Sequence, residues 1–175
     1  MEDFLLVKKI IDFTPREYYH NLLFNKNRFD VIPIMQAIGS SEIIEYILNF
    51  FPQFQDEIME YETPAGENLL RFAIYEGNHK IVSLLLKRSP KKMMTHLLKT
   101  DVYGVTSFHY AIIKKQKKII LQLLQHSEKF GYHIAKQVMN NGISALELAN
   151  THLDKKTINI IKSYLSKKNL TNNSL

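Results

Sequence analysis

Similar segments recur along this chain at a constant interval, which we call the period. This repetition is the feature that most constrains the fold. A glycine opens each of three similar segments, and an alanine follows each glycine seven residues later. The equally spaced glycines are Gly66, Gly104 and Gly142, and the alanines are Ala73, Ala111 and Ala149. A fourth, degenerate copy begins at Asp30 and has Ala37 in the alanine position. A unit this short cannot bury an apolar face alone, so the units are predicted to stack side by side.

Each unit carries two apolar segments with helical spacing. In the second segment, apolar residues recur three and four positions apart, which places one apolar stripe on a short helix. These residues are Ile81, Leu84 and Leu85 in one unit, and Ile119, Ile120, Leu123 and Leu124 in the next. The glycine allows the positive φ of a tight turn, and the small alanine allows neighbouring helices to approach closely. The period therefore predicts an all-α fold.

The segment YGVTSFHYA, residues 103–111, resembles the signature T-P-L-H-x-A of the ankyrin repeat, with Ser107 in the proline position. The other units keep the spacing but replace signature residues. Asn68 and Arg71 stand at the threonine and histidine positions of the second unit, and Ser144 stands at the threonine position of the last. The resemblance implies an ankyrin-repeat solenoid of about four helix–turn–helix repeats, with hairpin-like loops and an N-terminal helical cap.

We divide the chain into a helical cap at 1–26, repeats at about 27–62, 63–100, 101–138 and 139–165, and a flexible tail at 166–175. The period exceeds the repeat length of the ankyrin family, about 33 residues, by about five. The extra residues lie between repeats and contain an apolar pair before each turn, so we expect an added helical turn that packs on the stack. In the cap, Thr14 to Glu17 has the pattern of a capping box with proline at the first helical position, which predicts a helix through Phe24.

Ser107 and His109 could suggest nucleophilic catalysis, but residues two positions apart on a helix do not face each other. No carboxylate has a recognisable role beside them, and in the ankyrin pattern Thr106 and His109 are structural. The sequence has no cysteine, no histidine pair at metal-ligand spacing and no glycine-rich phosphate loop. We therefore expect a protein that is not an enzyme, with no catalytic residue, metal or cofactor.

Charge is distributed unevenly along the chain. Residues 1–66 contain 11 acidic and 5 basic residues, whereas residues 67–175 contain 6 acidic and 18 basic residues. Lysines cluster at 87–92 and again at 114–118. This asymmetry favours either a solvated surface without a binding role or a basic face for an acidic partner. Binding of nucleic acid or of an anionic membrane is the alternative function, although no aromatic residues interleave with these lysines as in a specific nucleic-acid binder.

The ankyrin resemblance implies instead a module that binds a partner protein. In that family, partners contact the hairpin tips and the exposed side of the first helix, which line a concave groove. The corresponding positions are Val102, Tyr103, Val105, Ile113 and Lys114 in the third unit, Glu67, Tyr75 and Glu76 in the second, and Asn140, Asn141, Ile143 and His152 in the fourth. The four apolar residues of the third unit would form an exposed cluster, which is typical of a partner surface unless the extra residues cover it.

The location and the identity of the partner rest on resemblance. The N-terminus lacks the pattern of a secretory signal, and no stretch approaches the roughly 20 apolar residues that cross a bilayer. We expect a monomer without membrane insertion. The chain is rich in lysine, isoleucine and asparagine, as are small ankyrin-repeat proteins of intracellular bacteria or large DNA viruses. That likeness implies a cytoplasmic protein, or an effector secreted into a host cell without a classical signal peptide that binds a host protein.

Overall fold

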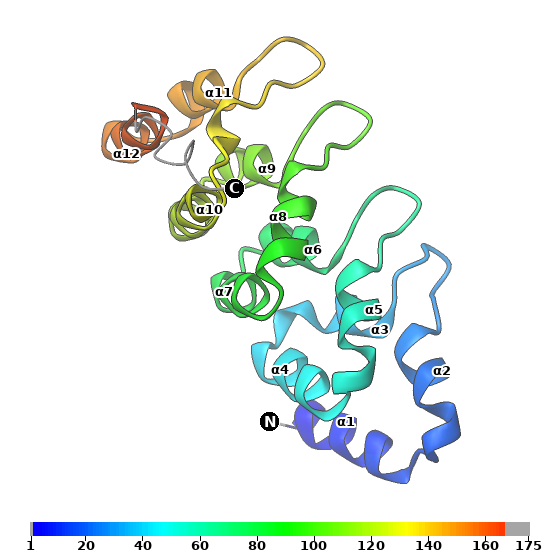
Figure 1. Cartoon of the computed structure of the whole chain (residues 1–175). Helices are drawn as coiled ribbons and strands as arrows, with labels where there is room; N and C mark the ends of the chain where they lie inside the picture. The colour runs from blue at the N-terminus through cyan, green and yellow to red at the C-terminus, as the bar shows by residue number, and fades with distance from the viewer. Residues whose placement is uncertain (1, 167–175) are drawn as a thin grey trace, which may run out of the picture.

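The computed structural model describes residues 2–166 of the 175-residue chain. Within these residues the chain forms twelve α-helices and four short 3-10 helices, and no β-strand. The helices stack into an elongated solenoid, with α1 at one end and α11 and α12 at the other (Figure 1). The all-α fold of stacked helix–turn–helix units, which the period predicts, is confirmed.

The solenoid consists of four helix pairs, each with an inner helix that follows a hairpin loop and an outer helix that follows a short turn. The inner helices are α3 (Pro33–Gln36), α6 (Leu69–Tyr75), α9 (Ser107–Ile113) and α11 (Ala145–His152). The outer helices are α4 (Ser41–Phe50), α7 (His79–Arg88), α10 (Lys117–Lys129) and α12 (Lys155–Ser166). In the first pair, a 3-10 turn at Ala37–Gly39 prolongs α3. Successive inner helices contact each other, as do successive outer helices, so each pair covers the next.

The alanines of the period lie where the inner helices meet. Ala73, Ala111 and Ala149 have no exposed surface, and α9 contacts α6 on one side and α11 on the other. A larger side chain at these positions would force the helices apart, because protein interiors are close-packed. Ile81 and Ile120 on the apolar stripes of the outer helices are buried to the same extent. The core is therefore continuous along the stack.

A polar side chain caps each of the last three inner helices. Asn68, Thr106 and Ser144, again one period apart, each accept a hydrogen bond from the backbone N–H three residues later, at 3.0, 3.4 and 3.2 Å. The N–H of Thr106 in turn donates to Nδ1 of His109 at 3.1 Å, and the N–H of Ser144 donates to Glu147 at 2.8 Å. These bonds satisfy backbone donors that a helix start leaves without a partner.

The turn from an inner to an outer helix contains a residue in the left-handed conformation. This residue is Gly77 (φ 70°) between α6 and α7, and Lys115 (φ 56°) between α9 and α10. In both turns, the following residue donates its N–H to the carbonyl of the buried alanine in the inner helix at 2.9 Å. A lysine in this conformation carries a strain of roughly 1–2 kcal/mol that a glycine avoids.

The loops that precede the inner helices are hairpins that project to the same side of the stack (Figure 1). The glycines of the period supply their left-handed residue, with φ of 77° at Gly66, 76° at Gly104 and 83° at Gly142. The first hairpin has no glycine, and Asp30 adopts the same conformation with φ of 57°. The degenerate first copy thus keeps the backbone of the turn although it loses the residue that marks the turn in the sequence.

The extra residues of the period form added helices, as predicted. They are α5 (Gln55–Glu60), α8 (Pro90–Leu98) and a 3-10 helix at Ile134–Lys136. Their apolar pairs are buried, apart from the half-buried Leu98. His96 of α8 is also buried, and its Nε2 donates to the carbonyl of Met59 in α5 at 2.8 Å. The added helices therefore join successive units.

Two helices, α1 (Glu2–Phe13) and α2 (Tyr19–Phe24), cover the first pair. The capping box predicted at Thr14 is wrong, because the Thr14 hydroxyl donates to the carbonyl of Ile10 in α1 at 2.6 Å. The segment that follows begins as a 3-10 helix at Arg16–Tyr18 without a side-chain cap.

The flexible tail predicted for 166–175 lies outside the described residues, except for Ser166 at the end of α12. The division into cap and repeats stays a prediction.

We expect Gly104→Ala to lower the free energy of unfolding more than Gly66→Ala. Both glycines are left-handed, so alanine costs roughly 1–2 kcal/mol at either position. At Gly104 an added Cβ would also lie 2.6 Å from the backbone nitrogen of Asn140, whereas at Gly66 nothing lies within 4 Å. Urea denaturation should show a loss of about 1 kcal/mol for Gly66→Ala and at least ~2 kcal/mol for Gly104→Ala. Equal losses would contradict this close approach of the hairpins.

Candidate functional site

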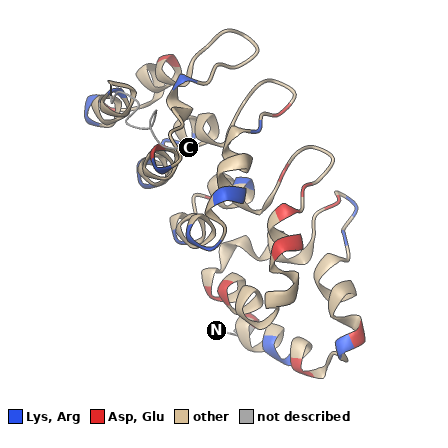
Figure 2. Ribbon diagram, viewed as in Figure 1, with Lys and Arg blue, Asp and Glu red and all other residues tan. Residues whose placement is uncertain are grey.

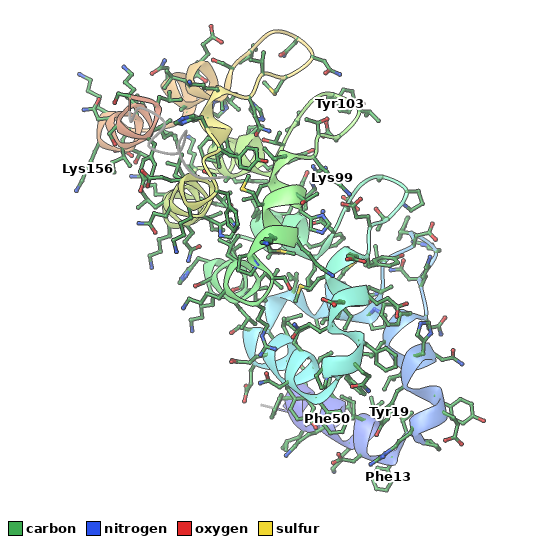
Figure 3. The ribbon with its side chains drawn as sticks, viewed as in Figure 1. Phe13, Tyr19, Phe50, Lys99, Tyr103 and Lys156 are labelled. Atoms are coloured by element: carbon green, nitrogen blue, oxygen red, sulfur yellow. The ribbon has the colours of Figure 1, made fainter. Side chains whose placement is uncertain are left out.

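The third hairpin presents two apolar side chains to solvent. Val102 is 82% exposed and Tyr103 is 72% exposed. Tyr103 lies at the tip of the hairpin and points away from the helices (Figure 3). Behind the tip, the Oδ1 atom of Asp101 accepts hydrogen bonds from the N–H groups of Tyr103 and Val105, both at 2.9 Å. The backbone of the tip is therefore held in one conformation while its apolar side chains stay exposed.

Asp101 also joins this hairpin to the inner helix. Its Oδ2 atom accepts a hydrogen bond from the hydroxyl of Tyr110 in α9 at 2.9 Å. Burial raises the pKa of Asp101, but the hydrogen bonds from Val105, Tyr103 and Tyr110 outweigh it, and the pKa lies below its ordinary value. Burial and the Asp101 carboxylate raise the pKa of Tyr110 to about 12. At neutral pH the contact is thus a carboxylate that accepts from a neutral tyrosine.

Two tyrosines and two cations form a stack across α6 and α9. The ring centroids of Tyr75 and Tyr110 are 5.0 Å apart. Lys114 Nζ lies 5.1 Å from the centroid of Tyr75, and the guanidinium carbon of Arg71 lies 5.8 Å from the centroid of Tyr110. A cation over each ring adds an electrostatic attraction to the ring contact. The stack couples the second unit to the third and leaves Tyr75 43% exposed.

A shallow hollow of about 100 Å³ lies beside this stack, lined by Glu67, Arg71, Phe72, Tyr75 and Glu76. Arg71 is only 3% exposed, and its Nη2 donates to the carbonyl of Lys99 at 3.2 Å. The two carboxylates and the guanidinium place both signs of charge around the aromatic rings. Such a mixture can orient a polar or aromatic side chain of a bound molecule. The predicted residues of the second unit all line this hollow.

The predicted apolar residues of the third unit do not lie together. Val102 and Tyr103 are at the hairpin tip, and Val105 is half-buried on the returning arm of the hairpin. Ile113, which is 38% exposed, is the last residue of α9 and lies roughly 9 Å along the helix from its first residue. Beside Ile113, Lys114 begins the turn and reaches over Tyr75. The exposure of the tip shows that the added helices do not cover it.

The predicted residues of the fourth unit have mixed roles. Asn140 fastens the fourth hairpin to the third, because its side chain and its N–H donate to two carbonyls at the third tip, at 2.9 and 3.0 Å. The Oδ1 atom of Asn141 accepts from the N–H of Ile143 at 3.1 Å, and Ile143 is 38% exposed. His152 is half-buried in the last turn of α11. Among the four predicted residues of the fourth unit, Ile143 is the one that presents an exposed apolar side chain on the hairpin.

The sequence reasoning missed four residues of this face. Arg71, Phe72 and Tyr110 belong to the stack and the hollow, and Phe29 is 64% exposed at the tip of the first hairpin. The period itself could have indicated two of them. Tyr110 lies one period after Phe72, and Phe29 is directly before Asp30, as Tyr103 is directly before Gly104. The contacts of Tyr110 with Tyr75 and Arg71 across units have no signal in the sequence.

The serine and the histidine of the third unit are enclosed in the core. Neither Ser107 nor His109 has exposed surface, so a substrate has no access to them. Burial lowers the pKa of His109, and the nearby Gln137 carbonyl and Asp101 carboxylate oppose this shift without outweighing it. His109 is therefore a neutral structural residue at physiological pH. A nucleophile needs an accessible position and an activating base, and Ser107 has no such position.

Neither a metal-binding cluster nor a membrane-spanning helix is present within residues 2–166. No group of three or more histidine, aspartate or glutamate side chains there could hold a metal ion. In the same residues, no helix has both the length and the apolar character needed to cross a membrane.

We expect the free energy of unfolding to fall as the pH is lowered from about 7 to 5. Burial lowers the pKa of His109 and of His126 in the folded chain, whereas in the unfolded chain each histidine titrates near 6.5. The unfolded chain therefore binds more protons in this range, and protonation favours unfolding. Urea denaturation at several pH values measures the loss. His109→Gln and His126→Gln should each make the dependence shallower, and a dependence that neither substitution changes would contradict the assignment.

The chain matches a model of a known protein family. Residues 34–137, more than half of the chain, match a family model described as ankyrin repeats in three copies. The match covers α3 to α10, and α11 and α12 continue the same period beyond it. No curated protein matches the chain.

Proposed function

Because this chain belongs to the ankyrin-repeat family, we propose that it is a non-catalytic module that binds a partner protein through its inner face. The inner face consists of the hairpin tips and the exposed side of α6, α9 and α11, which correspond to the concave groove of the family. Ankyrin repeats are generally protein–protein interaction modules. We take residues 27–165 as the binding module and residues 1–26 as its cap.

The exposure of Val102 and Tyr103 on a hairpin with a fixed backbone carries this proposal. Burial of each of these side chains against a partner is favourable, by roughly 25 cal/mol of free energy per Å² of apolar surface removed from water. Hydrogen bonds to Asp101 already order the backbone of the tip, so binding costs little additional conformational entropy. Exposed aromatic side chains on preorganised elements are the usual centres of binding energy in interfaces.

The stack beside the tip supports the same surface. Tyr75 is partly exposed, and the hollow next to it is bordered by Glu67 and Glu76, with Lys114 above the ring. A partner that lies across α6 and α9 can place a polar or aromatic side chain in the hollow while another part of it covers the tip of the third hairpin. The contacts with the partner would then extend over two units.

The finer identity of the partner rests on resemblance. The likeness to small ankyrin-repeat proteins of intracellular bacteria or large DNA viruses implies a host protein as the partner, with this chain acting as a secreted bacterial effector. The charges and rings of the inner face do not depend on that prediction. Binding through the inner face can therefore be tested with any cell extract that contains the partner.

Tyr103→Asp should abolish capture of the partner by immobilised chain. A charged side chain cannot enter the apolar contact, and loss of a central aromatic residue costs about 2 kcal/mol or more, roughly a 30-fold weakening. The matched control is Tyr18→Asp in the cap, which changes a tyrosine of similar exposure (54%) outside the inner face. Quantitative proteomics of the captured proteins should show a partner retained by the wild type and the control and lost by Tyr103→Asp. The same recovery by all three chains would contradict the proposed face.

A further inference from the structure

Six exposed lysines line the edge of the stack where the inner helices end and the outer helices begin, which we call the turn edge. They are Lys80, Lys115, Lys117, Lys118, Lys155 and Lys156. The acidic residues at this edge are Glu42, which is the second residue of α4, Glu76 and Asp154. Basic residues gather on α7, α10 and α12, while most acidic residues lie on the N-terminal half of the stack (Figure 2). Over the last three units the turn edge is therefore a strongly basic surface, which the described helices leave open.

Three of these lysines repeat with the period. Lys80, Lys118 and Lys156 follow one another at this interval, and each is the second residue of its outer helix. α7 contacts α10, and α10 contacts α12. Packed helices lie about 8–10 Å apart, so the three lysines form a row with steps of about 10 Å. Lys117 and Lys155, one residue earlier in their helices, form a parallel row.

The fold leaves most of this charge unpaired. Among the described residues, Lys117 is the one lysine of the turn edge with a carboxylate partner, and its Nζ lies 2.7 Å from Asp154. By contrast, Lys92 of α8 pairs with Asp56 and Glu60, and Lys99 pairs with Glu62. The positive charge of the turn edge is thus available to a bound anion.

Lys115 adds an independent observation. It adopts the left-handed conformation with φ of 56°, at the position that Gly77 occupies in the preceding turn. A glycine would avoid the strain, so the lysine stands here at a cost of roughly 1–2 kcal/mol to the turn. It is exposed, and its place between Lys114 and Lys117 adds its charge to theirs at this turn.

We propose that the turn edge binds the surface of an anionic lipid bilayer through the lipid headgroups. A bilayer requires only exposed cations near one plane, and each lysine close to such a surface strengthens binding by roughly fivefold. Nucleic-acid binders need more, either aromatic rings that stack on bases or an element that enters a groove. The six cations of the turn edge are all lysines, no aromatic residue lies within the runs 114–118 and 155–156, and the lysines sit on turns and helix starts that form no projecting element.

The turn edge and the hairpin tips lie at opposite ends of the inner helices. The hairpins lead into the first residues of α6, α9 and α11, whereas the turn edge follows their last residues. A bilayer bound at the turn edge therefore leaves the tip of the third hairpin accessible. This second surface does not depend on the proposed function of the inner face.

Sedimentation of the full chain with lipid vesicles tests the proposal. The probes are vesicles of phosphatidylcholine alone, vesicles of phosphatidylcholine mixed with phosphatidylserine, and a duplex DNA of arbitrary sequence. The variant Lys80→Glu/Lys118→Glu/Lys156→Glu reverses the row, and Lys80→Gln/Lys118→Gln/Lys156→Gln neutralises it more mildly. The matched control Lys9→Glu/Lys91→Glu/Lys136→Glu makes the same change in net charge at exposed lysines elsewhere. Circular dichroism checks that each variant is folded.

The wild type should bind the mixed vesicles and not phosphatidylcholine alone, and added salt should weaken the binding. Both turn-edge variants should bind at least about tenfold more weakly, while the control stays within about threefold of the wild type. Equal binding to both kinds of vesicle, or equal weakening in the control and the turn-edge variants, would overturn the proposal. Tighter binding to the duplex DNA than to the mixed vesicles would overturn it in favour of a nucleic-acid partner.

Discussion

The close approach of successive inner helices at one alanine in each unit is the contact on which the rest of the structure depends. Ala73, Ala111 and Ala149 are fully buried because α6, α9 and α11 meet at these small side chains. Because the inner helices approach one another closely at these alanines, equivalent positions of neighbouring units lie side by side, in one register, along the stack. The stacking of Tyr75 on Tyr110 across two units follows from this register.

Hydrogen bonds of polar side chains then fix the hairpin loops and the start of α9. Asp101 orders the tip of the third hairpin and accepts from Tyr110, while Asn140 fastens the fourth hairpin to the third. Neutral His109 completes the cap of α9 inside the core. As a result, the exposed apolar side chains stand on a backbone that is already fixed, which is the physical condition for a binding surface with a low entropic cost.

The same register separates two surfaces of different chemistry. The inner face combines aromatic rings with charges of both signs, as the hollow beside Tyr75 illustrates. The turn edge carries rows of lysines that the ion pairs of the fold leave mostly free. Since a solenoid exposes both ends of its inner helices, a molecule bound at the turn edge leaves the hairpin tips accessible.

The sequence by itself determined the period, the all-α class and the added helices, whereas it left open whether these helices cover the hairpin tip at Tyr103. These features depend on local spacing and on the conformations open to single residues, and both can be read along the chain. Only the tertiary structure decided that Arg71, Phe72 and Tyr110 join Tyr75, that Asn140 serves the fold, and that Thr14 bonds back to α1 instead of capping the next helix. The first two depend on distances between side chains that lie in different units, and the third on which of two nearby backbone groups a hydroxyl reaches. A period aligns such residues but does not specify which atoms meet, because rotamers and helix contacts settle that only when the stack forms.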